Sequence, residues 1–203
     1  MNNKYTNEDY WDSFYKVGFE TLDPSSFARF SLKYIKENLP AIPITLLDLG
    51  CGNGRDTHFF AKKGIYALGI DMSTIDESPN IVKGDIFKNI RESDVYYLRF
   101  LIHTMKESLA DKLLDMIHDK MYNNSIIMLE TRSSKGVCDQ PSCETNFESA
   151  VGTSHFRMLY SLDYLTEKVK DKFNIVFSEE DTGLAKYNDS DPEIIRMILK
   201  KKL

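Results

Sequence analysis

Residues 46–71 read LLDLGCGNGRDTHFFAKKGIYALGID. The run 44–49, which leads into this stretch, is apolar and too short for a helix, so it predicts a buried parallel strand. Gly50, Gly52 and Gly54 follow directly. Glycines at alternate positions let the backbone turn tightly and keep side chains out of the way of a ligand. A strand that ends in such a turn is typical of a nucleotide-binding fold.

The residues after the turn complete this unit. A helical pattern over 55–63 stops at Gly64, and the free N–H groups at the start of that helix favour a carboxylate or phosphate. Residues 65–70 predict a second strand, which ends in Asp71, 21 residues beyond Gly50 (71 minus 50). An acid at this position is placed to accept both hydroxyls of a ribose. We therefore expect a nucleoside ligand.

The glycine spacing narrows the choice of nucleoside. A dinucleotide fingerprint is G-x-G-x-x-G, whereas the spacing from Gly50 to Gly54 is G-x-G-x-G, with Asp48 just before it. A carboxylate beside the turn would repel a diphosphate and suits a cationic ligand. Here the sequence resembles the class I S-adenosylmethionine-dependent methyltransferases, which have D-x-G-x-G-x-G after strand one and an acid closing strand two. A nicotinamide-binding enzyme and a loop with incidental glycines are the alternatives.

The resemblance implies an α/β, Rossmann-like methyltransferase fold. This fold has a seven-stranded, mostly parallel sheet with an antiparallel C-terminal strand, helices on both faces and an N-terminal helical cap. The implied cofactor is S-adenosyl-L-methionine. Its implied contacts are Asp48, Gly50, Gly52 and Asp56 at the methionine end, Asp71 at the ribose with Met72 beside it, and Asp85 and Ile86 at the adenine. For Asp85, a capped turn into a short helix is the alternative reading.

Length and charge set the broad class. The 203 residues fit one domain, with a helical cap over 1–40, a core over 41–203 and a lid-like loop near 133–153. The net charge of -5, without a basic run, gives no general attraction to nucleic acid or to an anionic membrane. The N/D-P-P-Y/F motif of DNA amino-methylases is also absent. We therefore expect a small-molecule acceptor and neither a nucleic-acid nor a membrane partner.

Targeting and metal signals are weak. The N-terminus lacks the apolar core of a signal peptide, and no stretch approaches the ~20 apolar residues of a membrane span, which favours a soluble cytoplasmic protein. Cys138 and Cys143 would need two further ligands to hold zinc, and no close Cys or His pair offers them. We expect no metal site.

The remaining elements follow from apolar patterns. Residues 7–38 predict two helices, the second starting near residues 23–26 (DPSS) with the proline in its first turn. Residues 72–80 predict a loop where the family usually has a helix. Apolar spacing predicts further helices that carry Leu109 to Met121 and Leu162 to Phe173. The other predicted strands are 80–83, 94–100, 125–130, 174–179 and 193–200. The last two would form an antiparallel hairpin.

Candidate catalytic residues follow from the chemistry of methyl transfer. The donor carries its own leaving group, so the protein must mainly align and desolvate the acceptor, and a base helps if the acceptor is protonated. His103 and His155 are the candidates for that base, and a purely structural role is the alternative for each. The hydroxyls of Tyr10 and Tyr15 could orient an amine.

Four arginines are candidates for acceptor binding. Arg29, Arg99, Arg132 and Arg157 lie at predicted strand ends or beside predicted lid segments. Arginine binds phosphate or carboxylate through two parallel N–H groups. If two or more converge, the acceptor is anionic. Scattered surface arginines are the alternative.

Short segments elsewhere extend the resemblance over nearly the whole chain. YWDSFY, PSSFARF, RFLIHTM, ETRSSKG, SHFR and GLAKYNDSDPEIIRMILKK look like a group of small bacterial methyltransferases associated with surface-polysaccharide (capsule) biosynthesis. This resemblance implies a small polar acceptor, and N-methylation of ethanolamine phosphate is the first expectation. O-methylation of a sugar or sugar phosphate is one alternative. A non-catalytic subunit that binds the cofactor is the other.

Overall fold

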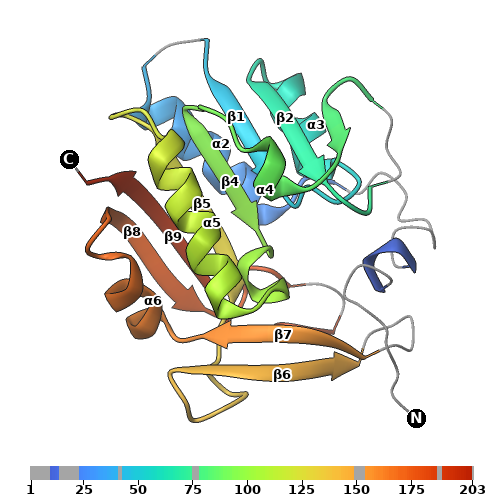
Figure 1. Cartoon of the computed structure of the whole chain (residues 1–203), viewed down its shortest axis with the longest axis vertical. Helices are drawn as coiled ribbons and strands as arrows, with labels where there is room; N and C mark the ends of the chain where they lie inside the picture. The colour runs from blue at the N-terminus through green and yellow to red at the C-terminus, as the bar shows by residue number, and fades with distance from the viewer. Residues whose placement is uncertain are drawn as a thin grey trace.

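A seven-stranded sheet lies at the centre of the structure, a computed structural model that describes residues 10–13, 23–40, 43–74, 78–148, 154–186 and 189–202 (Figure 1). The strand order is β3-β2-β1-β4-β5-β9-β8. All neighbours run parallel except β9, which is antiparallel to both β5 and β8. The strands are β1 (Thr45–Leu49), β2 (Tyr66–Asp71), β3 (Ile81–Lys83), β4 (Val95–Arg99), β5 (Ile126–Arg132), β8 (Phe173–Asp181) and β9 (Ile194–Lys201). The predicted sheet and its C-terminal hairpin are confirmed.

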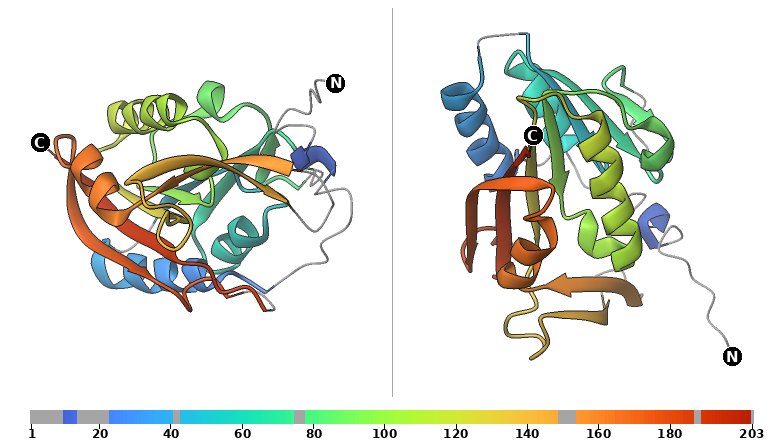
Figure 2. Two further views of the ribbon diagram at one scale, coloured as in Figure 1. Left: turned by 90° about the horizontal axis from the view of Figure 1, so that it is seen from below. Right: turned by 60° about the vertical axis from the view of Figure 1, so that its left-hand side comes forward.

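Helices cover both faces of the sheet (Figure 2). On one face, α2 (Ser26–Asn38) and α3 (Arg55–Lys62) bury Phe27, Ile35 and Phe60 against the sheet. The other face carries α4 (Ile86–Asn89), α5 (Glu107–Lys120) and α6 (Leu162–Val169), with the short η1 (Ile102–Thr104) at one end. No helix in the described part of the chain has both the length and the apolar character that a membrane span needs.

The N-terminal helices are placed differently from the expected cap. Ser25 caps α2, because its side chain accepts from the N–H of Ala28 at 2.9 Å. The helix therefore starts within the predicted stretch 23–26, but Pro24 precedes the cap and does not lie in the first turn. However, α2 forms a layer on the sheet, since its apolar side belongs to the core. Residues 10–13 form a separate helical piece that contacts His155. The loop predicted over 72–80 is confirmed for 72–74 and 78–80, which contain no helix.

The expected lid-like loop near 133–153 is partly wrong, because β6 (Ser142–Glu148) lies within it. This strand pairs antiparallel with β7 (Ser154–Tyr160) in a two-stranded sheet, which we call the ribbon. Figure 1 shows the ribbon crossing below the main sheet, at the ends of β4 and β5. The sequence of β6 is polar and lacks an apolar run, so only its pairing with β7 reveals it as a strand. Residues 149–153 lie outside the described part of the chain.

The segment that leads into the ribbon contains a feature that sequence reasoning missed. Cys138 and Cys143 form a disulfide across this turn.

Candidate active site

The glycine turn lies between the ends of β1 and β2. The N–H groups of Gly50 and Cys51 both donate to the carbonyl of Ile70, at 2.8 and 3.3 Å. Gly50 has a φ of +73°, and a Cβ there would lie 2.7 Å from Leu101, which follows β4. Only glycine fits this position, because a side chain would meet both a left-handed backbone and a buried neighbour.

Asp71 faces this turn from the end of β2. One carboxylate oxygen accepts from the N–H of Gly52 at 2.9 Å and the other from the N–H of Ser73 at 2.8 Å. Burial raises the pKa of the Asp71 carboxyl, and the two N–H groups oppose this shift. Each oxygen keeps a lone pair for a further donor, so Asp71 is fixed in place and can still accept hydroxyls. Met72, next to it, is 46% exposed.

Asp48 is a buried acid just before the turn. Its side chain accepts from the hydroxyl of Thr57 at 2.6 Å. Burial raises the pKa of Asp48 to about 8; the Thr57 hydrogen bond and the charge of Arg99 oppose the rise, and the charges of Asp56 and Asp71 add to it. The group is therefore mainly neutral at pH 7 and would ionise beside a cation.

This pKa makes cofactor affinity depend on pH. S-adenosylmethionine, which carries a sulfonium, should favour ionised Asp48, so its binding at pH 7 should release a proton from this carboxyl and tighten as pH rises through about 8. Calorimetry at pH 7 in two buffers of different ionisation enthalpy measures the release. Asp48→Asn should abolish that part of it. Equal proton release by the variant and the original protein would contradict the assignment.

Asp56, expected at the methionine end of the cofactor, is bonded within the protein. Its carboxylate accepts from the backbone N–H of Ser25 at 2.9 Å, the Ser25 hydroxyl at 2.6 Å and the Tyr97 hydroxyl at 2.9 Å. Burial alone would raise its pKa, but the charges of Arg55 and Arg99 and the Ser25 bonds lower it. This geometry favours an anchor between the start of α2 and α3 over direct cofactor contact.

Asp85 and Ile86 lie at the start of α4. The Asp85 carboxylate accepts from the N–H of Phe87 at 2.9 Å and so caps this helix. Ile86 is buried in the core. The structure thus contains the capped turn that was the alternative interpretation of Asp85. A capping carboxylate keeps lone pairs for another donor, so the adenine role stays a proposal.

A buried ion network continues from Asp56 across the sheet. Glu130 is fully buried and accepts from Nε of Arg99 at 3.0 Å and from Nε of Arg196 at 2.8 Å. Nε of Arg99 also lies 3.9 Å from Asp56. Two carboxylates therefore already neutralise Arg99, which sets it apart from the other candidate arginines. Sequence reasoning missed Glu130 and Arg196. The signal that could have found them is that each is a charged residue inside an otherwise apolar strand.

His103 occupies a second cluster, at the end of β5. The backbone N–H of Arg132 donates to its Nδ1 at 3.2 Å, and the Thr131 hydroxyl lies 3.1 Å from the same atom. An amide N–H can only donate, so Nδ1 is the acceptor and the proton of the neutral ring is on Nε2. Burial lowers the pKa of His103 well below its usual range, and the charges of Arg157 and Arg132 lower it further. His103 is thus suited to donate a hydrogen bond and poorly suited to act as a base.

The ribbon brings His155 and Arg157 to this cluster. Directly opposite them in β6 are Phe147 and Thr145, respectively. Paired residues and residues two apart share a face, so these four side chains lie on one side of the ribbon. The Arg132 guanidinium lies over the Phe147 ring, 5.6 Å from its centre. This face of the ribbon therefore meets the end of β5.

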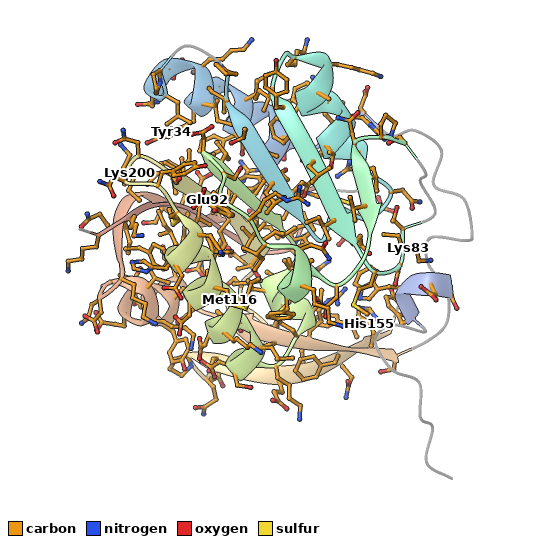
Figure 3. The ribbon with its side chains drawn as sticks, turned by 45° about the horizontal axis from the view of Figure 1, so that its top comes forward. Tyr34, Lys83, Glu92, Met116, His155 and Lys200 are labelled. Atoms are coloured by element: carbon orange, nitrogen blue, oxygen red, sulfur yellow. A yellow bond between two sulfur atoms is a disulfide. The ribbon has the colours of Figure 1, made fainter. Side chains whose placement is uncertain are left out.

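The helical piece 10–13 packs on the same residues. Tyr10 is buried and stacks on His155 with ring centres 4.1 Å apart, and Trp11 lies under the guanidinium of Arg157 at 5.2 Å. Figure 3 shows His155 at the end of the molecule that also carries Lys83, away from Tyr34 and Lys200. The ribbon and the N-terminal segment thus enclose one end of the sheet.

The structure separates the four candidate arginines. Arg132 and Arg157 converge on His103, whose pKa both of them lower. Among the residues that the structure describes, no carboxylate pairs with Arg132, and burial lowers the pKa of its guanidinium. Arg29 is exposed on α2, on the opposite face of the sheet from α5. Tyr15 lies outside the described residues.

Comparison with known proteins places this geometry in a fold class. No family model and no curated protein matches the sequence. The Burkholderia thailandensis 1,6-didemethyltoxoflavin-N1-methyltransferase, solved with 1,6-didemethyltoxoflavin and S-adenosylhomocysteine, is similar in structure, with a TM-score of 0.74 and 16% identity over 97% of this chain and 88% of that one. A Clostridium acetobutylicum S-adenosylmethionine-dependent methyltransferase has a TM-score of 0.66 and 13% identity over 96% and 97%.

A third similar structure is the glycopeptide N-methyltransferase MtfA with S-adenosylmethionine. Its TM-score is 0.64, with 15% identity over 88% of this chain and 95% of that one. The fold is that of the class I S-adenosylmethionine-dependent methyltransferases.

Proposed function

We propose that the protein is an S-adenosylmethionine-dependent methyltransferase that acts on a small anionic acceptor. The observation that supports the proposal is the cluster of Arg132, Arg157 and His155 around His103, together with a glycine turn that has Asp71 bonded to it and Asp48 just before it. The turn and its acids suit a cationic nucleoside, whereas the arginines suit an anion. We infer that the turn and the arginines belong to one site, with a place for each of two substrates.

The cofactor would lie along the glycine turn. Asp71 would accept the ribose hydroxyls, Asp48 would face the positive methionine end, and Asp85 would accept from the adenine amino group beside Ile86. When bound, S-adenosylmethionine supplies an electrophilic methyl group on a sulfonium. Two of the similar structures contain S-adenosylmethionine or S-adenosylhomocysteine, which supports this choice.

The acceptor end of the site favours a phosphate. Arg132 and Arg157 carry two positive charges, which match the roughly two negative charges of a phosphate monoester at neutral pH. Ethanolamine phosphate, which has an amine at its other end, is our leading acceptor, and its methylation would serve surface-glycan biosynthesis. Two similar structures are named as N-methyltransferases, which supports an amine. A sugar phosphate methylated on oxygen is the alternative.

His155 is the residue we assign to proton removal. An alkyl ammonium must lose a proton before its nitrogen lone pair can attack the methyl carbon, and His155 would take that proton. The new N–C bond forms as the S–C bond breaks, and the sulfonium becomes a neutral thioether. His103, with its proton on Nε2, would hold the acceptor by donating a hydrogen bond. Tyr10, stacked on His155, would fix the imidazole plane.

The assignment is tested by S-adenosylhomocysteine release with ethanolamine phosphate, ethanolamine and sugar phosphates. Turnover should require the phosphate. Arg132→Leu and Arg157→Leu should each raise the KM for the phosphorylated acceptor roughly 10- to 150-fold, because a hydrogen bond to a charged group contributes about 1.5 to 3 kcal/mol. Arg29→Leu is the matched control, since Arg29 is exposed on α2, and should leave KM unchanged.

Two outcomes would contradict the proposal. Equal turnover of ethanolamine and its phosphate would show that Arg132 and Arg157 do not bind an acceptor phosphate. Cofactor binding without turnover of any acceptor would favour the alternative of a non-catalytic binding subunit.

A further inference from the structure

Each arginine near His103 lies over an aromatic ring. The guanidinium-to-ring distances are 4.4 Å for Arg99 over Phe100, 5.6 Å for Arg132 over Phe147 and 5.2 Å for Arg157 over Trp11. The rings come from the end of β4, from β6 and from residues 10–13. A guanidinium over an aromatic face is attracted by the ring and keeps its N–H groups directed outward, in its own plane.

The three pairs differ in what else holds the cation. Arg99 is already fixed by Glu130 at 3.0 Å, so its ring is a second support. The Arg132 guanidinium lies over the Phe147 ring, and no carboxylate in the described part of the chain pairs with it. A carboxylate in place of the Phe147 ring would neutralise the charge of Arg132 and occupy its N–H donors. The aromatic ring orients the guanidinium but leaves its charge and its N–H donors available to a ligand.

The position of Phe147 in the ribbon adds to this argument. Phe147 pairs directly with His155, and Thr145, two residues earlier, pairs with Arg157. The ring thus lies on the ribbon face that carries both the histidine assigned to proton removal and the second arginine. This placement puts Phe147 beside the expected acceptor, although no sequence motif marks it.

We propose that Phe147 is a positioning residue that holds the Arg132 guanidinium toward the acceptor phosphate and so favours a dianion. The inference rests on the proposed function, because it assumes that the arginine pair binds a phosphate. Phe147 does not touch the reacting atoms. It acts through Arg132, by restricting the directions in which the guanidinium can point.

Binding of inorganic phosphate and of ethanolamine phosphate tests this role without turnover. Trp11 is the single tryptophan of the chain and lies under Arg157, so its fluorescence reports on the arginine pair. With S-adenosylhomocysteine present, Phe147→Leu should weaken binding of both probes about 3- to 12-fold, the cost of ordering the freed Arg132 side chain on binding. Phe147→Tyr keeps the ring and should bind within about 2-fold of the original protein.

A matched control separates this effect from a general loss of packing. Phe30 lies under Arg196 at 5.5 Å on the opposite face of the sheet, so Phe30→Leu makes the same change at an arginine that does not meet the acceptor. Its phosphate affinity should be unchanged. Thermal unfolding of all three variants shows whether the ribbon is retained.

Three results would overturn the inference. If Phe147→Leu binds phosphate as tightly as the original protein, Phe147 has no positioning role, while the proposed methyl transfer stands. If Phe147→Tyr binds phosphate as weakly as Phe147→Leu, the aromatic ring does not position Arg132. If the original protein binds neither probe but still methylates an uncharged acceptor, the phosphate site and the anionic acceptor both fail, and only the reaction class survives.

Discussion

Glu130→Gln should lower the free energy of unfolding by about 3 to 5 kcal/mol, the cost of leaving buried charges without their partner. Glu130 is fully buried and bonds Arg99 at 3.0 Å and Arg196 at 2.8 Å. Glutamine keeps the shape but not the charge, so two guanidinium groups lose their shared anion. For a chain of this length the midpoint of thermal unfolding should fall by roughly 6 to 20 °C.

Glu179→Gln is the matched control for this variant. Glu179 also pairs with Arg196, at 3.5 Å, but its side chain is 33% exposed. Water screens such a pair, so the change should cost less than about 1 kcal/mol. If the two variants lose the same free energy of unfolding, the buried Glu130 network stabilises the fold no more than an exposed ion pair does.

Asp71→Ala should weaken the binding of S-adenosylhomocysteine by about 1 to 3 kcal/mol, a factor of roughly 5 to 150 in affinity. The Asp71 carboxylate is oriented by the N–H groups of Gly52 and Ser73, at 2.9 and 2.8 Å, and has lone pairs left for ribose hydroxyls. Removing it takes away both hydroxyl contacts and frees those two amides. Calorimetry at constant pH measures the change.

Two further variants separate the ribose contact from the turn itself. Asp71→Asn keeps one acceptor oxygen for the turn, so its affinity for S-adenosylhomocysteine should lie between those of the original protein and Asp71→Ala. Asp12 lies near enough to Asp71 for its charge to raise the pKa of that carboxyl. Asp12→Asn should leave affinity within about 2-fold, because it removes a neighbouring charge and no ribose bond. Unchanged affinity in Asp71→Ala would refute the ribose assignment.

The sequence predicted the centre of the fold because each step there is local. The glycine turn, the run before it and the acid after the next strand are recognisable within residues 46–71, and the structure forms β1, α3 and β2 from them. The start of α2 was predicted to within residues 23–26 for the same reason, since a cap depends on residues three positions apart, but the pattern placed Pro24 inside the helix and the structure places it before the Ser25 cap.

What the sequence could not predict depends on pairing between distant segments. β6 exists because β7 pairs with it, and the ribbon face is set by a register that no local pattern encodes. The same holds for Asp56, whose carboxylate is bonded by Ser25, 31 positions earlier in the chain. His103 was a candidate base until the N–H of Arg132 at 3.2 Å fixed its tautomer. Arginines at predicted strand ends were identified, but their partners were not.

Binding of S-adenosylhomocysteine and NAD to the unmodified protein, measured side by side by calorimetry, tests the central claim most directly. The G-x-G-x-G turn, with the Asp71 carboxylate held by the N–H groups of Gly52 and Ser73, should bind S-adenosylhomocysteine, whereas NAD needs the G-x-G-x-x-G spacing that holds a diphosphate. Saturable binding of S-adenosylhomocysteine with none for NAD is the predicted result. Tight NAD binding with no heat from S-adenosylhomocysteine would contradict the account.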